Sequence, residues 1–337
     1  MKAIITGANG FIGCHMAKLL VAEGVETYCM VRKTSDLTLL KQLNPDLAGI
    51  TLAYADVTDF ASLKDTLPGM DLVFHLAGSV KAYDQVGFDK VNYHGTKNVL
   101  RACFEVNPGV QRIVIASSQA AAGPGILGKP ATEDQPARPL PRDLYGISKF
   151  KAEFIARKYM DRLPIVITRP ASVFGEGDVV SLDLFKSVKS GIKLRAIGGV
   201  EEYSVIDVDD LCAGFWACAT NPAAVGETFF FTVDKVIKYE DLHEVVAKMV
   251  FGKSYGGLIP LRLPGKLLYL VSILMELVGK IQGEVPFINR TKIIESLSPA
   301  QSVSSAKAKA VLGWKASQTI PSMVVKAGMW YKEHGMI

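Results

Sequence analysis

The chain has 337 residues, of which 49% are hydrophobic and 21% are charged, and its formal net charge is +5. This composition supports a substantial apolar core in one large domain or in two closely packed ones. The 38 Lys and Arg residues are scattered and form no basic run, so the sequence excludes an obvious nucleic-acid-binding surface.

The cysteines are five in number and include no Cys-x-x-Cys pair. Most of them lie in apolar stretches, which favours reduced thiols in the core and a reducing, cytoplasmic location. The pattern argues against a zinc site, and we expect no metal. The first apolar run is broken by glycines after a few residues, so it does not resemble a secretory leader.

The first predicted strand, Ala3–Ile5, is followed by three regularly spaced glycines and then by a helical pattern over His15–Ala22. Strand, glycine turn and helix is the arrangement of a dinucleotide-binding site. Gly7 allows a tight turn, Gly10 allows a pyrophosphate to approach the backbone, and Gly13 allows the helix to pack on the strand. The N–H groups at the helix N-terminus would face the pyrophosphate.

Apolar strands alternate with helical patterns through the rest of the first half. This alternation predicts an α/β fold with a Rossmann-type, doubly wound parallel sheet. The expected strands are 27–31, 50–54, 72–76, 112–116, 165–168 and 228–232, and the expected helices are 92–106, 145–161 and 211–219.

The opening Thr-Gly-x-x-Gly-x-x-Gly resembles the signature of the extended short-chain dehydrogenase/reductase superfamily, which includes NAD-dependent epimerases and dehydratases. The resemblance extends over nearly the full chain and implies a nicotinamide cofactor and a Ser-Tyr-Lys catalytic site. It implies cofactor contacts from the turn residues Gly7, Asn9, Gly10, Phe11, Ile12 and Gly13.

Two cations, Arg32 and Lys33, follow the second strand, where an NAD enzyme usually has an acid for the ribose 2′-hydroxyl. A guanidinium suits the extra phosphate of NADP. NADP-dependent relatives in the superfamily often have Arg at this position. We therefore expect NADP, with NAD as the alternative, while a solvated basic strand end is the competing interpretation.

Three further segments resemble cofactor contacts of the superfamily. Asp56 and Val57 follow the third strand and resemble the adenine contact, which is compatible with a helix N-cap at Thr58 or Asp59. The other two segments would line the nicotinamide ribose and pass over the nicotinamide. Their residues are Leu76, Ala77 and Gly78, and Pro170, Ser172 and Val173.

Tyr145 and Lys149 are four residues apart and so lie on one face of the predicted helix. A free phenol has a pKa near 10, and a neighbouring ammonium group favours the phenolate. Such a pair is common by chance, but its position after a glycine fingerprint and a strand ending in serine favours catalysis. By resemblance, both residues would also contact the cofactor, with Lys149 on the nicotinamide ribose.

The third catalytic residue is expected from the pair Ser117-Ser118. In the superfamily the catalytic Ser lies five residues before a Gly, and Gly123 therefore selects Ser118 as the group that holds the substrate oxygen. Ser117 is the alternative and is expected to support the cofactor.

The segment 169–178 resembles the 3β-hydroxysteroid dehydrogenase branch, with dihydroflavonol-reductase-like enzymes close behind. This resemblance implies NADP-dependent hydride transfer to or from a small hydrophobic ketone or alcohol. One alternative is a sugar-nucleotide epimerase or dehydratase with tightly bound NAD, although such enzymes usually have Asn in place of Ser172. A third interpretation is a non-catalytic dinucleotide sensor, which keeps the fold but loses the active-site Tyr. The presence of Tyr145 and Lys149 argues against it.

The C-terminal part carries the greatest information on substrate. An apolar segment at 264–280 is interrupted by Ser272 and Glu276 and is too short to span a bilayer. It is followed by Pro-Phe-x-Asn-Arg at 286–290, and this combination resembles the steroid-dehydrogenase branch. The segment could cap the substrate, contact a membrane peripherally, form a homodimer contact or be a core helix.

We expect a dinucleotide-binding domain over 1–175, to which 205–234 returns, and a substrate-binding region over 176–204 and 235–337. Within the returning segment, Asp209 and Asp210 are adjacent acids that resemble a metal pair. A helix N-cap and a solvated acid are the favoured interpretation.

Overall fold

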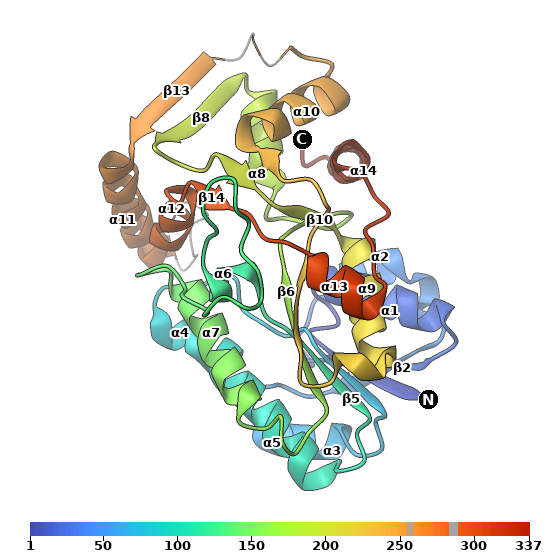
Figure 1. The fold of residues 1–337 in the computed structure, drawn as a ribbon. Helices are drawn as coiled ribbons and strands as arrows, with labels where there is room; N and C mark the ends of the chain where they lie inside the picture. Colours follow the sequence, from blue (N-terminus) through green and yellow to red (C-terminus); the bar gives the residue numbers. More distant parts are fainter. Residues whose placement is uncertain (255, 257–258, 283–288) are drawn as a thin grey trace.

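The structure is a computed structural model that describes residues 1–254, 256, 259–282 and 289–337. Its centre is a seven-stranded sheet in the order β11-β6-β5-β4-β1-β2-β3, and every neighbouring pair is parallel (Figure 1). The strands are β1 (Lys2–Thr6), β2 (Glu26–Val31), β3 (Ile50–Tyr54), β4 (Leu72–His75), β5 (Arg112–Ala116), β6 (Ile165–Pro170) and β11 (Thr228–Phe231). The predicted fold class and all seven strands are confirmed.

Helices cover both faces of this sheet, as the apolar strands require. On one face, Ile5 of β1 packs with side chains of α1 and α9, and on the other, Ile4 packs with side chains of α3 and α5. The helices of this part are α1 (Phe11–Ala22), α2 (Thr38–Leu43), α3 (Phe60–Thr66), α5 (Thr96–Val106), α6 (Gln119–Ala122), α7 (Leu144–Arg157) and α9 (Val208–Thr220).

The helix predicted over 92–106 begins earlier than the sequence pattern indicated. It starts as α4 (Gln85–Asp89), continues through a π-helical segment η2 (Lys90–Gly95) and ends as α5. The π-helical segment shifts the hydrogen-bond register, so the apolar spacing of α5 does not continue into α4. Asp84 caps the true start by accepting a hydrogen bond from the Gly87 N–H at 2.8 Å. Helix α7 also ends at Arg157, before the predicted end at 161.

The C-terminal region forms smaller layers above the carboxyl edge of the large sheet (Figure 1). One core lies among α8, α10 and α14, and a two-stranded parallel sheet pairs β8 with β13. The elements are β7 (Ser172–Phe174), α8 (Leu182–Lys189), β8 (Ile192–Ile197), β9 (Glu202–Tyr203), β10 (Val205–Asp207), β12 (Ile237–Lys238), α10 (Tyr239–Phe251), β13 (Ile259–Pro264), α11 (Gly265–Gln282), α12 (Arg290–Ser296), β14 (Ala300–Gln301), α13 (Ala306–Leu312) and α14 (Ile320–Glu333).

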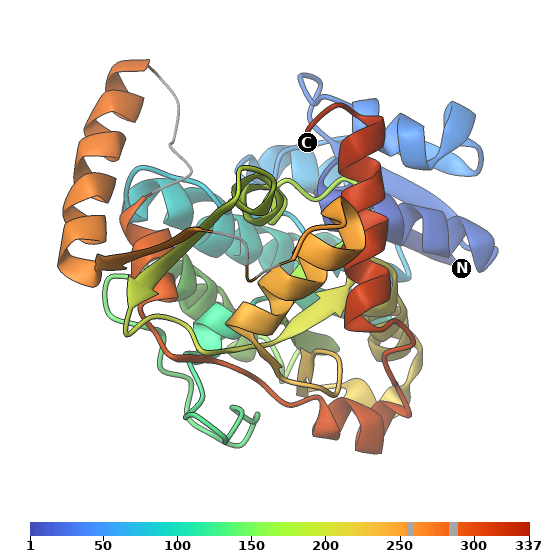
Figure 2. The same ribbon diagram turned by 90° about the horizontal axis from the view of Figure 1, so that it is seen from above.

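The apolar segment at 264–280 corresponds to α11, which lies at the outer edge of the molecule in both views (Figures 1 and 2). Residues 286–288 of the Pro-Phe-x-Asn-Arg motif lie outside the described residues. Within the described part of the chain, no helix has the length and apolar composition needed to cross a membrane. The division into two domains stays a prediction.

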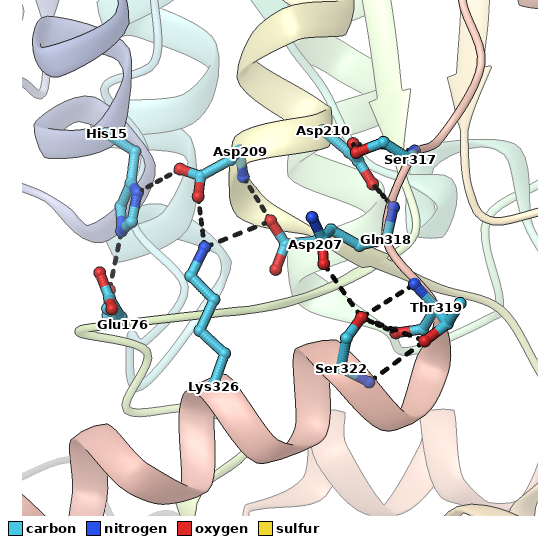
Figure 3. Close-up of polar contacts among 10 residues, drawn as sticks. All are labelled: His15, Glu176, Asp207, Asp209, Asp210, Ser317, Gln318, Thr319, Ser322 and Lys326. Carbon is cyan, nitrogen blue, oxygen red and sulfur yellow. Dashed lines mark hydrogen bonds and ion pairs between the residues drawn. The ribbon is translucent and has the colours of Figure 1, made fainter.

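A polar network joins the first helix, the returning helix and the last helix (Figure 3). His15 on α1 contacts Asp209 Oδ1 through Nδ1 at 2.7 Å and the Glu176 carbonyl through Nε2 at 2.9 Å. Lys326 on α14 forms an ion pair with the same Asp209.

Of the adjacent acids of α9, Asp209 has a side chain that is 53% exposed, as the favoured interpretation expected, whereas Asp210 is buried, which corrects the expectation for that residue. Asp209 binds His15 and Lys326, while Asp210 accepts hydrogen bonds from the backbone N–H groups of Ser317 and Gln318 at 3.0 and 2.9 Å (Figure 3). The N-cap is Asp207, one position before the helix. The sequence could not reveal these contacts because their partners lie far along the chain.

A buried ion pair fixes α7 against the sheet. The Glu153 carboxylate of α7 accepts two hydrogen bonds from Arg169 of β6, at 2.8 Å from Nε and 2.6 Å from Nη2. It also accepts one from the Ser117 hydroxyl at 2.7 Å. Both charged side chains are about 2–3% exposed. This bidentate geometry supplies the pairing that buried charges require.

We predict that Glu153→Gln lowers the free energy of unfolding by about 3–5 kcal/mol, because it leaves the buried Arg169 guanidinium without its counter-charge. Urea unfolding at constant m-value measures the change. Glu105→Gln is the matched control, since it removes an exposed ion pair with Arg101 and should cost less than about 1 kcal/mol. Equal stability of the two variants would contradict the prediction.

Candidate active site

The predicted site residues gather along one edge of the large sheet, where its parallel strands end. The glycine turn follows β1, Arg32 follows β2, Asp56 lies just beyond β3, and Ser118 lies just beyond β5. In open α/β sheets ligands bind outside the carboxyl ends of the strands. The topology therefore brings together residues that are far apart in the sequence.

The glycine turn has the close contacts that the sequence implied. Gly7 has φ +71°, and a Cβ there would lie 2.8 Å from the Ala77 backbone, while a Cβ on Gly13 would lie 2.2 Å from the Gly7 carbonyl oxygen. Gly10 is exposed, and the nearest atom to a Cβ there would be the Gly7 carbonyl oxygen at 3.2 Å. Among the described residues, no side chain caps α1. The open side of the turn therefore fits an anionic diphosphate.

The second strand ends in exposed cations. Arg32 and Lys33 are both exposed, and the Arg32 N–H donates to the Ser35 hydroxyl at 3.0 Å. Asp36 follows in the same loop, but its Oδ1 accepts from the Thr38 N–H and hydroxyl, at 2.9 and 2.6 Å. Asn9 of the glycine turn donates to the Asp36 carbonyl at 3.2 Å, which joins this loop to the turn.

The third strand is followed by Asp56, which forms a local turn. Its Oδ1 accepts hydrogen bonds from the Thr58 N–H and hydroxyl, both at 2.8 Å. Val57 is buried beneath it. Asp59 caps α3 by accepting from the Ala61 N–H at 3.1 Å, as one of the two compatible readings predicted. The adenine contact of Asp56 stays a prediction.

The fourth strand is held beside the glycine turn by His75. Its Nδ1 lies 2.8 Å from the Thr6 hydroxyl and its Nε2 lies 2.9 Å from the Thr96 hydroxyl. Since Thr96 donates its own hydrogen to the Asn92 carbonyl, the hydrogen-bond pattern assigns the His75 proton to Nε2. Burial, reinforced by the charge of Lys149, lowers the pKa of His75 to about 3, so the ring is neutral.

Leu76 and Ala77 continue this strand into the site, and their backbone bonds to Thr6. The Leu76 N–H donates to the Thr6 carbonyl at 3.2 Å and the Ala77 N–H to the Thr6 hydroxyl at 3.1 Å. Gly78 follows and passes over Lys149, because a Cβ on Gly78 would lie 3.0 Å from the Lys149 Nζ. The predicted ribose segment and the predicted ribose-binding lysine are therefore neighbours.

Lys149 is only 7% exposed and donates to the Ala116 carbonyl at 2.8 Å. Burial lowers the pKa of its ammonium to about 8, although the nearby Glu153 carboxylate raises it in part. Asn92 of η2 completes this region: its Nδ2 donates to the Ser148 hydroxyl at 2.8 Å, and its Oδ1 accepts from the Ser79 N–H at 2.7 Å. The π-helical segment thus anchors the loop that begins at Gly78.

Tyr145 and Ser118 meet, although 26 residues separate them in the chain. The Tyr145 phenol lies near the Ser118 hydroxyl, which lowers the phenol pKa, and Phe88 packs beside the phenol ring with centroids 6.1 Å apart. Burial raises the pKa of Tyr145 to about 12, while Ser118 and the charge of Lys292 act in the opposite direction. The phenol is therefore protonated at neutral pH, as a proton donor must be.

Ser117, the alternative to Ser118, has a different environment. It is 5% exposed and its hydroxyl donates to Glu153, so in this structure it serves the buried ion pair. Pro170, the last residue of β6, is buried, while Ser172 and Val173 are partly exposed within β7. The Ser172 hydroxyl donates to the Tyr203 phenol at 2.6 Å.

Sequence analysis missed a charged group opposite Tyr145. Lys292 and Glu295 of α12 form an ion pair at 2.9 Å, and both charges act on the Tyr145 phenol. Lys292 also acts on Tyr203, which binds Ser172. Burial opposes the Lys292 charge, but Glu295 and the two phenols raise the pKa of the ammonium above its usual range. The three-residue spacing of Lys292 and Glu295 can be seen in the sequence, but the sequence does not show that this pair lies opposite Tyr145.

Asp143 is the second group that was missed. It is 1% exposed and caps α7, accepting a hydrogen bond from the Gly146 N–H at 2.9 Å. Burial, assisted by the Glu295 charge, raises the pKa of Asp143 to about 7. An Asp two residues before Tyr145 is a recognisable N-cap signal, and it could have been found from the sequence. Its cap sets the position of the first turn of α7, which carries Tyr145.

These groups form an arrangement with a defined chemical capacity. A protonated phenol lies against a hydroxyl, a buried ammonium lies on the next turn of the same helix, and an anion-accepting glycine turn lies on the same sheet edge. Such a set can bind a dinucleotide and exchange a proton with a substrate oxygen.

Comparison with known proteins gives a consistent result. The model of the NAD dependent epimerase/dehydratase family matches residues 3–230. The chain is 28% identical to the 3beta-hydroxysteroid-dehydrogenase/decarboxylase isoform 1 of Arabidopsis thaliana, over 92% of this chain and 75% of the relative. It is 30% identical to the 3 beta-hydroxysteroid dehydrogenase type 7 of Mus musculus, over 71% and 70% of the two chains.

Solved structures resemble the whole chain. The crystal structure of gox2253 has a TM-score of 0.78 and 26% identity, and covers 99% of both chains. The UDP-glucuronic acid 4-epimerase of Bacillus cereus, solved with UDP-glucuronic acid and NAD, has a TM-score of 0.77 over 99% and 100% of the chains. At 20% identity, this second likeness shows the fold alone. The chain belongs to the NAD dependent epimerase/dehydratase family of the extended short-chain dehydrogenases/reductases.

Proposed function

We propose that the chain is an NADP-dependent oxidoreductase that transfers a hydride between nicotinamide and the carbonyl or alcohol carbon of a hydrophobic substrate, steroid-like or flavonoid-like. The contact between the Ser118 hydroxyl and the Tyr145 phenol carries this proposal. A donor pair of this kind is what a developing alkoxide requires. The family membership supports a nicotinamide cofactor.

Different residues would bind the cofactor and transfer the proton. The glycine turn and the N-terminus of α1 would hold the diphosphate, Arg32 the extra phosphate, and Lys149 the nicotinamide ribose. When bound, the nicotinamide supplies or accepts the hydride. In carbonyl reduction, Ser118 orients and polarises the substrate oxygen, and Tyr145 donates the proton to it. The Lys149 ammonium stabilises the phenolate that remains, and in alcohol oxidation the proton moves in reverse.

The proposed substrate class rests on the named relatives and on the chain itself. The Arabidopsis and mouse relatives are named as 3β-hydroxysteroid dehydrogenases, and their similarity extends over most of this chain. Lys292, Glu295 and Tyr203 add polar groups near Tyr145. We infer that the reacting end of the substrate meets these polar groups.

A sugar-nucleotide epimerase or dehydratase with tightly bound NAD is the second candidate. The match to the NAD dependent epimerase/dehydratase family favours it. Arg32 and Ser172 count against it. The two candidates are separated by denaturing the purified protein and measuring released dinucleotide: stoichiometric NAD would support the epimerase, and a cofactor-free protein would support the oxidoreductase.

We predict that Tyr145→Phe lowers kcat for NADPH-dependent reduction of a cyclic ketone by about 100-fold or more, because no phenol remains to donate the proton. The dissociation constant for NADPH, measured by fluorescence titration, should change by less than about three-fold. Tyr159→Phe, a change beyond the C-terminal end of the same helix, is the control and should retain full activity. Normal turnover by Tyr145→Phe would disprove the assignment.

We predict that the rate constant kcat/KM for ketone reduction falls as the pH rises through about 8. The lowered pKa of Lys149 means that its ammonium is present below about pH 8 and is lost above it, while Tyr145 stays protonated. A profile between about pH 6 and 10 at constant ionic strength measures the fall. Lys151→Met, which removes an exposed neighbouring ammonium, should leave the profile unchanged. A profile that stays flat above pH 9 would contradict the role of Lys149.

We predict that Arg32→Ser raises the dissociation constant for NADPH about ten-fold or more and leaves that for NADH nearly unchanged, because only NADPH carries the extra phosphate. Isothermal titration of both cofactors measures the preference. Lys18→Ser removes another exposed cation, on α1, and should not alter it. An equal effect of Arg32→Ser on both cofactors would show that Arg32 does not read the phosphate.

A further inference from the structure

Helix α11 carries its apolar side chains on the outside. Eight of them lie between 37% and 87% exposed. We call them the outer face of α11. At 100° per residue they occupy an arc of about 160°, and over 267–281 they extend along the helix for about 21 Å. The outer face consists of Leu267, Leu270, Val271, Leu274, Met275, Leu277, Val278 and Ile281.

Two polar residues of α11, Ser272 and Glu276, point inward instead. Ser272 is fully buried, and the Glu276 side chain, 12% exposed, accepts hydrogen bonds from the backbone N–H and Nε of Arg290 at 2.8 and 2.7 Å. The Tyr83 hydroxyl donates to the Gly279 carbonyl at 3.3 Å. The inner side of α11 therefore combines these polar contacts with the buried Leu268, while most of the apolar side chains of the helix face outward, unlike those of an ordinary surface helix.

The described elements that pack on α11 are β8, β13 and α12, and all contact its inner side or its ends. Figures 1 and 2 both show α11 as the outermost element on its side of the molecule. An exposed apolar surface of this extent marks an interaction site.

Charge decides which occupant fits this surface. Residues 248–282 contain five basic residues and one acid, and that acid is Glu276, whose carboxylate is held by Arg290. Arg262, on β13, and Lys266, in the first turn of α11, are exposed around the N-terminal end of this helix. An apolar helix face with cations beside it and no exposed carboxylate on the helix matches a bilayer with anionic headgroups.

We propose that the outer face of α11 lies in the surface of an anionic phospholipid bilayer, with the apolar side chains among the acyl chains and the neighbouring cations at the headgroups. The position has a functional consequence that rests on the proposed function. Helix α11 packs on α12, which carries Lys292 opposite Tyr145. A lipophilic ketone or alcohol dissolved in the bilayer would thus be close to the site.

The test is co-sedimentation of the full chain with vesicles of phosphatidylcholine, with and without about 30% phosphatidylserine. Wild type should bind the anionic vesicles, and Leu274→Glu/Ile281→Glu should bind about ten-fold more weakly or not at all. Val225→Glu/Met329→Glu is the matched control, since it adds two charges at exposed apolar positions on other elements and should bind like wild type. Circular dichroism verifies that each variant is folded.

A second pair of variants tests the cations independently. Arg262→Gln/Lys266→Gln should weaken binding to anionic vesicles by about five-fold or more, and high salt should weaken wild-type binding in the same way. Equal sedimentation of wild type and the glutamate variant would overturn the proposal. So would a wild-type dimer that these glutamates convert to a monomer without any vesicle binding, because a second copy would then cover α11.

The proposed function is tested separately by turnover of a water-soluble ketone without vesicles. Vesicle binding without ketone reduction would refute the oxidoreductase and leave the membrane surface standing. Ketone reduction without vesicle binding would refute only the membrane surface.

Discussion

The position of the candidate catalytic groups depends on one carboxylate. Glu153 binds Arg169 from β6 and the Ser117 hydroxyl at the end of β5, and it lies on the helix that carries Tyr145 and Lys149. Ser118 follows directly after Ser117, so the same carboxylate positions both partners of the phenol–hydroxyl contact. In a buried site this pairing also satisfies the guanidinium, which makes it costly to rearrange. The candidate catalytic groups at the carboxyl edge of the sheet therefore depend on the buried Glu153–Arg169 ion pair that lies beneath them.

The local parts of this arrangement could be predicted from sequence. Strand positions, the glycine turn and the helix that carries Tyr145 follow from hydrophobic period, from the absence of a Cβ and from turn chemistry within a few residues. The helical start before Thr96 could not be predicted, because the π-helical segment η2 interrupts the apolar spacing on which helix prediction depends. The partners of Asp209 and Asp210 could not be predicted either, because they lie far along the chain.

The surroundings of Tyr145 show the same limit. Sequence analysis named Lys149 as the cation that influences the phenol, and the structure adds Lys292, with Glu295 beside it, from a helix near the end of the chain. Lys292 lies on α12, in a different layer from α7, which carries Tyr145 and Lys149. The residue that supplies this cation can therefore differ between enzymes with different substrates while α7 stays the same. A constant catalytic helix beside variable surrounding residues is typical of folds that support many reactions on one scaffold.

The network of His15, Asp209 and Lys326 has a further consequence. The His15 imidazole on α1 contacts the Asp209 carboxylate, which also forms an ion pair with Lys326 of α14. A truncation that removed α14 would leave Asp209 without its Lys326 partner and would weaken the contacts through which His15 holds the Glu176 carbonyl. One polar network thus joins the first and last helices, and a fusion or deletion at the C-terminal end would affect α1, the helix that follows the glycine turn.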